Sequence, residues 1–146
     1  MARFQIAGTA TIAGTTLRPP FSLYSVTNSG FWLVELAIVN TTDVACEYSL
    51  VRLEAAGTQG AALTEIPDDP DTVAVATGFA GHTADLSSGE VDQIIRRTFL
   101  GAAKGSAMIW TFGGRGIRVP KGTANGIGPV AVGTGQILDY WAVWDE

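Results

Sequence analysis

The chain has 146 residues, of which 47% are hydrophobic and 16% are charged, and this balance excludes an intrinsically disordered protein. Its 9 basic and 14 acidic side chains give a net charge of −5, which argues against nucleic acid as the partner. One cysteine and one histidine exclude an internal disulfide and a structural zinc site, so we expect one domain held by packing alone.

Residues 1–20 are predicted to form an extended N-terminal arm, which precedes the main domain at residues 21–146. The segment Arg18-Pro19-Pro20 forms a stiff, extended break between the two. Such an arm pairs with the edge of its own sheet or with that of a neighbouring copy. Its apolar side chains are therefore candidates for a subunit or capsid interface: Phe4, Ile6 and Ile12.

The rest of the chain predicts short strands separated by turns. Val, Ile and Thr make up 38 of the 146 residues, and clusters of Gly, Asn, Asp and Ser recur between the apolar runs. We expect about ten strands, at 4–12, 21–26, 31–39, 44–53, 73–79, 91–100, 106–112, 117–120, 127–132 and 136–144. The predicted fold class is all-β, a single-domain β-sandwich of the jelly-roll type.

The run at 31–39 is almost continuously apolar, interrupted by Glu35. This pattern predicts a central strand that is covered on both faces, or by the core on one face and a neighbouring subunit on the other. Residues 40–43 predict a turn. After it, the apolar phase shifts from Leu50 to Val51, which suggests a one-residue bulge near Leu50.

Residues 87–100 fit either a short helix or a strand, and we favour a strand for the later half. Two segments are predicted to form long loops: 55–71, which ends in the acidic sequence EIPDDPD, and 113–128. The second loop holds Arg115 and Arg118, which we include among the candidate interface residues.

The last strand, 136–144, alternates with a period of two, so Trp141 and Trp144 point to opposite faces of the sheet. At least one of them therefore faces outward as a candidate subunit or capsid contact. Trp32 and Trp110 lie among apolar neighbours, so we expect both side chains to pack in the core.

No pattern in the sequence predicts catalysis, a metal or a cofactor. A catalytic triad would need His82 with Ser87, Ser88 or Ser106 and an acid such as Asp85, and an exposed turn explains His82 better. The acidic run Glu65, Asp68, Asp69 and Asp71 lacks the spacing of an EF-hand loop and predicts a solvated turn. The glycine-rich segments at 113–116 and 122–135 lack the residues that follow a phosphate-binding loop.

The sequence resembles a family of small virion proteins of tailed phages. The resemblance lies in WLVELAIVNTT with the following VRLEAAGTQGAA, in IIRRTFLGAAKGSAMIWTFGGRGIRVPKG, and in the tryptophan-rich strand before the terminal Asp-Glu. It implies a sandwich or jelly-roll capsid decoration (cement) protein, a homo-oligomer and most simply a trimer, bound to the major capsid protein on the outside of the head. It implies no catalytic residues.

These observations predict a non-enzymatic virion protein that oligomerises and stabilises the assembled head. The alternative is a tail or head-fibre module that binds a host glycan, with Trp141 beside Asp139 as its contact. A small cupin-like metal enzyme is the weakest alternative, because one histidine falls short of its ligand set.

We expect synthesis in the host cytoplasm, since residues 1–20 lack the apolar stretch of a secretion signal. No membrane association is expected, because no window approaches about 18 continuous apolar residues.

Overall fold

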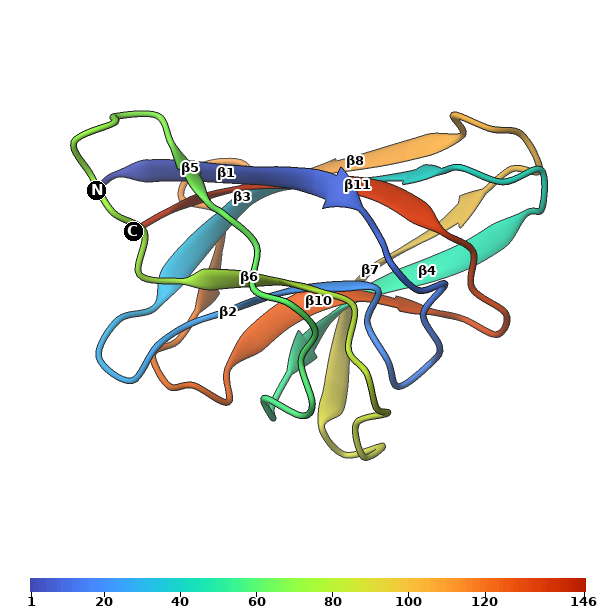
Figure 1. The fold of residues 1–146 in the computed structure, drawn as a ribbon, viewed down its shortest axis with the longest axis horizontal. Helices are drawn as coiled ribbons and strands as arrows, with labels where there is room; N and C mark the ends of the chain where they lie inside the picture. Colours follow the sequence, from blue (N-terminus) through green and yellow to red (C-terminus); the bar gives the residue numbers. More distant parts are fainter.

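In the computed structural model, which describes the backbone of residues 1–146 and every side chain except that of Asp92, the protein is a sandwich of two antiparallel β-sheets (Figure 1). No helix occurs within residues 1–146. The predicted all-β sandwich is therefore confirmed.

Sheet A has the strand order β5-β1-β11-β3-β8, and β9 also pairs with β3. Its strands are β1 (Arg3–Thr9), β3 (Phe31–Asn40), β5 (Ile66–Pro67), β8 (Ala107–Thr111), β9 (Ile117–Val119) and β11 (Leu138–Asp145). Sheet B has the order β6-β2-β10-β4-β7. Its strands are β2 (Phe21–Tyr24), β4 (Cys46–Leu53), β6 (Thr77–Ala80), β7 (Val91–Leu100) and β10 (Gly126–Ala131).

The core lies between the sheets and is built by alternation along the strands. In β11, Leu138, Tyr140, Ala142 and Trp144 are buried, whereas the residues between them are partly exposed, so the predicted alternation is confirmed. Phe21 of sheet B stacks on Tyr140 of sheet A with ring centroids 4.2 Å apart, and Phe4 stacks on Trp144 at 5.9 Å. These aromatic pairs fill the space between the sheets.

Of the two partners expected for the N-terminal segment, the structure shows the protein's own sheet, because strand β1 lies inside sheet A. It pairs with β11 over seven register positions, from Arg3↔Asp145 to Thr9↔Asp139, and with the short strand β5 on its other side. Phe4 and Ile6 are 1% and 2% exposed and belong to the core. The alternating side chains that suggested an adhesive arm instead complete the protein's own sheet.

The irregularity predicted near Leu50 is present, between Leu50 and Val51 in the pairing of β4 with β7, but β4 itself carries no extra residue. The register of β4 with β10 runs unbroken from Leu53↔Gly126 to Tyr48↔Ala131. The irregular pairing lies between β4 and β7, where β7 carries the extra residues. The apolar phase shifts at Val51 because Val51 and Leu53 join a second apolar cluster, separate from the main core.

Three other expectations have clear outcomes. Residues 91–100 form a strand, which resolves the choice between helix and strand. The predicted turn at 40–43 exists, and the buried Asn40 side chain holds it by accepting bonds from the backbone N–H and the hydroxyl of Thr42. The predicted loop at 55–71 contains the two-residue strand β5, which pairs with β1.

Candidate interaction surface

The two sheets differ in what covers their outer faces. In sheet B, every residue of β2 and β10 is buried, so both faces of these strands are covered. In sheet A, β1 and β11 alternate between buried and partly or fully exposed residues. Sheet A therefore has one face on the core and one face open to solvent.

Loops of the protein itself cover the outer face of sheet B. Leu86 packs with Tyr24, Val51, Leu53 and Val130 in the second apolar cluster. The Tyr24 hydroxyl donates a 2.7 Å hydrogen bond to the Ala55 carbonyl, and this ties a second loop to the same face. Both loops hang below sheet B in Figure 1.

An apolar row crosses the open face of sheet A. The strand registers place Ala7 beside Trp141, Trp141 beside Ala37 and Ala37 beside Ile109. Ile109 is 50% exposed and Trp141 is half-buried. Val143 and Val39 lie diagonal to this row on the same face, so the centre of the face is apolar.

Charged groups of both signs frame this row. Arg3 donates two hydrogen bonds, of 2.8 and 3.0 Å, to the Asp145 carboxylate, and the guanidinium of Arg118 lies 5.4 Å from the ring centroid of Trp32. The Trp141 indole N–H donates to Glu35 Oε1 at 2.7 Å, which fixes the ring against the sheet. A flat apolar centre inside a polar rim is the usual anatomy of a protein–protein contact.

The structure brings together only part of the predicted interface set. Trp141 and Arg118 lie on the outer face of sheet A. Arg115 is exposed in the turn between β8 and β9, and Ile12 packs beside Gly81 in the loop after β1.

The predictions for Phe4, Ile6 and Trp144 are wrong, because these side chains are buried in the core of the same chain. The reason is the pleat: each of them occupies the inward position of its strand, so the side chain reaches the opposite sheet.

The prediction that Trp32 lies in the core is also wrong, whereas that for Trp110 is confirmed. Phe31 and Leu33 point inward, so Trp32 between them points outward and contacts Arg118. Sequence reasoning missed Ile109 and Val143 as surface residues. The sequence at 107–111 is apolar at its first four positions, so it carries no alternation that would say which side chains face the core.

His82 is fully buried, and it is not the exposed turn residue that the sequence suggests. Its Nε2 lies 3.1 Å from the hydroxyl oxygen of Ser22, not of Ser87, Ser88 or Ser106, and its Nδ1 has no hydrogen-bond partner among the described groups. Asp85 pairs with Arg18 at 3.2 Å. Burial lowers the pKa of His82, which favours a neutral imidazole packed as part of the fold.

The acidic run forms a turn in which Asp69 accepts a hydrogen bond from the Asp71 N–H. Among the described side chains, no group of three or more His, Cys, Asp or Glu residues could hold a metal ion. Burial raises the pKa of the free thiol of Cys46. The described residues also contain no helix long and apolar enough to cross a bilayer.

Comparison with known proteins gives no relative: no protein-family model matches the chain, and no curated protein and no solved structure matches it.

Proposed function

We propose that the protein is a non-enzymatic virion structural protein of the capsid decoration type, which self-associates and docks on the major capsid protein of a tailed-phage head. One observation carries this proposal: the outer face of sheet A presents an apolar row in which Ala7 and Ile109 are exposed and Trp141 is partly exposed, with Ala37 buried between Trp141 and Ile109. Sheet B, by contrast, is covered by loops of its own chain.

The strand order supports a jelly roll. With β5, β6 and the three-residue strand β9, which pairs with β3, set aside, sheet A reads β1-β11-β3-β8 and sheet B reads β2-β10-β4-β7. This arrangement gives two four-stranded sheets in which most consecutive strands alternate between the sheets, as in the eight-stranded jelly rolls of capsid and lectin domains. The pair β5 and β6 then extends one edge of each sheet.

A protein of this kind acts by mass action. Binding to an assembled shell and not to its separated subunits stabilises the shell by about 2.7 kcal/mol per site when the free ligand is at a hundred times its Kd. A shell offers many equivalent sites, so a modest contact on a flat face is sufficient. The mixed charges at the rim of this face, Arg3, Asp145, Glu35 and Arg118, would set the register of docking.

The test is co-sedimentation with heads of the parent phage that were assembled without this protein. Wild-type protein should sediment with the heads, and Ile109→Asp should not, because it places a charge in the apolar row. Val44→Asp is the matched control, since Val44 is 55% exposed in the turn between β3 and β4, outside the apolar row, and the variant should bind like wild type. Failure of wild-type protein to bind heads would refute the proposal.

The second candidate is the glycan-binding module, favoured by the half-exposed ring of Trp141. Its indole N–H is already bonded to Glu35, so the ring face and the nearby Asp139 would contact a sugar. Binding of wild-type protein to a glycan array, lost in Trp141→Ala, together with no binding to heads, would favour this function over decoration.

A further inference from the structure

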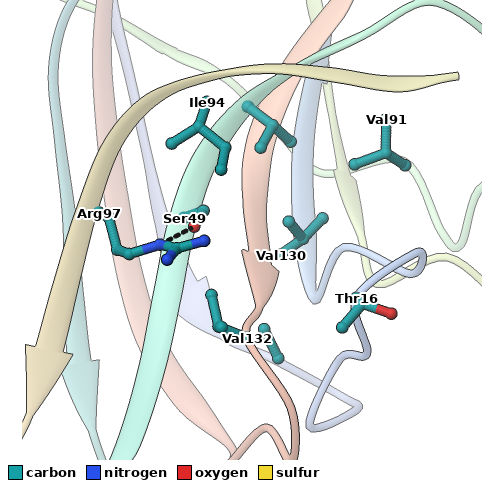
Figure 2. Close-up of a pocket in the computed structure, with 9 residues that line it drawn as sticks. Thr16, Ser49, Val91, Ile94, Arg97, Val130 and Val132 are labelled. Atoms are coloured by element: carbon teal, nitrogen blue, oxygen red, sulfur yellow. Dashed lines mark hydrogen bonds between the residues drawn. The ribbon is translucent and has the colours of Figure 1, made fainter. Parts of the chain in front are cut away.

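A shallow groove of about 200 Å³ lies on the outer face of sheet B beside strand β7. Figure 2 shows its apolar wall, in which Ile94 of β7 and Val130 and Val132 of the β10 segment face the same space. Val51 and Val91 complete the wall. The loops that cover the rest of sheet B leave this part open.

Arg97 is the one charged side chain among the described residues that line the groove. Its Nε lies 3.2 Å from the Ser49 hydroxyl oxygen, shown by the dashed line in Figure 2, and 3.4 Å from Glu47 Oε1. These contacts hold a half-exposed guanidinium at the rim. The groove therefore offers an apolar floor beside the ion pair of Arg97 and Glu47, in which the guanidinium stays half-exposed and can accept a second carboxylate.

The apolar surface extends beyond the groove along β7. Ile94 is 58% exposed, and Phe99, two residues after Arg97 on the same side of the strand, is 68% exposed. The groove itself is smaller than the 300–1,000 Å³ usual for small-molecule sites, so an aliphatic side chain from a protein suits it better than a cofactor.

The chain carries a segment with the matching chemistry, the loop between β5 and β6. Val73 on this loop is 86% exposed and Val75 is 44% exposed. Three carboxylates precede them, those of Asp68, Asp69 and Asp71. The loop therefore presents exposed aliphatic side chains with negative charge beside them, complementary to the groove and Arg97.

Hydrogen bonds hold this loop in shape. Asp69 accepts bonds from the Asp71 N–H, the Thr72 N–H and the Thr72 hydroxyl, which closes a turn just before Val73. The carboxylate of Glu146 accepts bonds from the N–H groups of Val75 and Ala76 at 2.8 and 2.7 Å. A preorganised loop loses little conformational entropy when it docks.

The loop and the groove lie on opposite sides of the molecule, so one chain cannot join them. Strand β6, which follows the loop, ends sheet B at one edge, and β7 ends it at the other. Figure 1 shows the loop beside the chain termini, away from β7 and β4. A contact between two different patches on identical chains is heterologous, and such contacts close into rings when the rotation allows.

We propose that copies of this chain assemble head to tail, with the acidic loop at residues 68–75 of one copy placing Val73 in the apolar groove beside Arg97 of the next. This contact deepens the proposed function and rests on the self-association that the function includes. It also gives a ring, such as the expected trimer, a physical basis in two complementary patches.

The test uses the full chain and needs no phage heads. Light scattering at micromolar concentration should give an oligomer for the wild type and monomers for Val73→Asp and for Ile94→Asp. Both substitutions change exposed side chains, and circular dichroism should show unchanged strand content and cooperative unfolding. Val44→Asp is the control for adding a charge at an exposed valine, and it should keep the wild-type mass.

Mixing the two variants tests the pairing itself. Val73→Asp keeps an intact groove and Ile94→Asp keeps an intact loop, so an equimolar mixture should form a heterodimer through one native contact and grow no further. A monomeric wild type, folded variants that keep the wild-type mass, or folded monomeric variants that do not pair would each overturn the inference. Ile109→Asp, which tests the docking face, should keep the wild-type mass, so docking on heads and the loop-in-groove contact fail separately.

Discussion

At the scale of single residues, the polar side chains inside the sandwich are as informative as the apolar ones. Ser25 shows this: its buried hydroxyl lies within hydrogen-bond distance of the carbonyl oxygens of Pro120, Gly122 and Asn125. One hydroxyl thereby fixes the turn that leads from β9 to β10. Buried polar groups of this kind are costly unless they are paired, so each pairing selects one conformation of the loop.

His82 departs from this rule, because its Nδ1 is buried without a hydrogen-bond partner, and it makes the free energy of unfolding depend on pH. Burial lowers its folded-state pKa below the ordinary 6.5, and no charged side chain contributes to this shift. The unfolded chain therefore binds a proton that the native chain does not as the pH falls below 6.5. The free energy of unfolding should decrease over that range and stay constant above it, as far as His82 is concerned.

The measurement is urea unfolding between about pH 7 and about pH 5, compared for wild type and His82→Gln. Gln cannot titrate, so the variant should lose less stability over this range than the wild type, whatever its stability at neutral pH. If the free energy of unfolding fell equally with pH in the two proteins, the assignment of a neutral, buried imidazole would be contradicted.

At the scale of elements, the turn after β3 links three strands through one side chain. Asn40 is fully buried, and its amide donates to the carbonyls of Val44 and Gly101 at 2.8 and 3.1 Å. Its carbonyl oxygen accepts two bonds from Thr42. The end of β3, the start of β4 and the end of β7 are thus held at one corner of the sandwich.

Asn40→Ala should therefore cost about 2–4 kcal/mol of unfolding free energy, because it leaves several buried carbonyl and N–H groups unpaired. Denaturant unfolding monitored by tryptophan fluorescence measures this loss. Asn28→Ala, in an exposed turn, is the control and should stay within about 0.5 kcal/mol of wild type. An equally small effect at Asn40 would show that water replaces these bonds.

At the scale of the whole molecule, the N-terminal segment is part of the sandwich and not an appendage to it. Phe4 stacks on Trp144, and the N–H of Ala2 donates to the carbonyl of Glu146, so both ends of the chain lie together in sheet A. The first and last strands thus complete one another, and the sheet is whole only when the entire chain has folded.

Phe4→Ala should destabilise the protein by about 3–5 kcal/mol, as expected for removing a buried aromatic side chain. Gln5→Ala, one residue further on the same strand but on the solvent side, should change stability by less than about 0.5 kcal/mol. Thermal unfolding of the two variants measures the difference. Equal stability of both would indicate a detachable arm.

Much of the fold could be predicted because it depends on local patterns. The alternation in 136–144 identified the strand and its two faces, though not which face is inward; the turn at Asn40 followed from side-chain chemistry, and the strand at 91–100 was the favoured of two alternatives. Hydrophobicity alternates with a period of two along the strands of a sandwich, because each strand turns one face to the core and the other to solvent.

The candidate surface could be predicted only in part, because the sequence marks outward residues but not what lies over them. It identified Trp141 as an outward candidate, yet it could not place Ile109 beside it, since the two meet only through the pairing of β3 with both β11 and β8. The separation of Phe4 from the surface likewise depends on β1 pairing with β11, 130 or more residues away in the chain.

By itself, then, the sequence determined most of the strands, the alternation of side chains along the last one and the all-β class, because these depend on neighbours along the chain. Tertiary structure alone decided that β1 joins the sheet, that loops cover sheet B and leave sheet A bare, and that an acidic loop and an arginine-lined groove lie at opposite edges. Strand pairing between distant segments sets these features, and no local pattern encodes a partner so far along the chain.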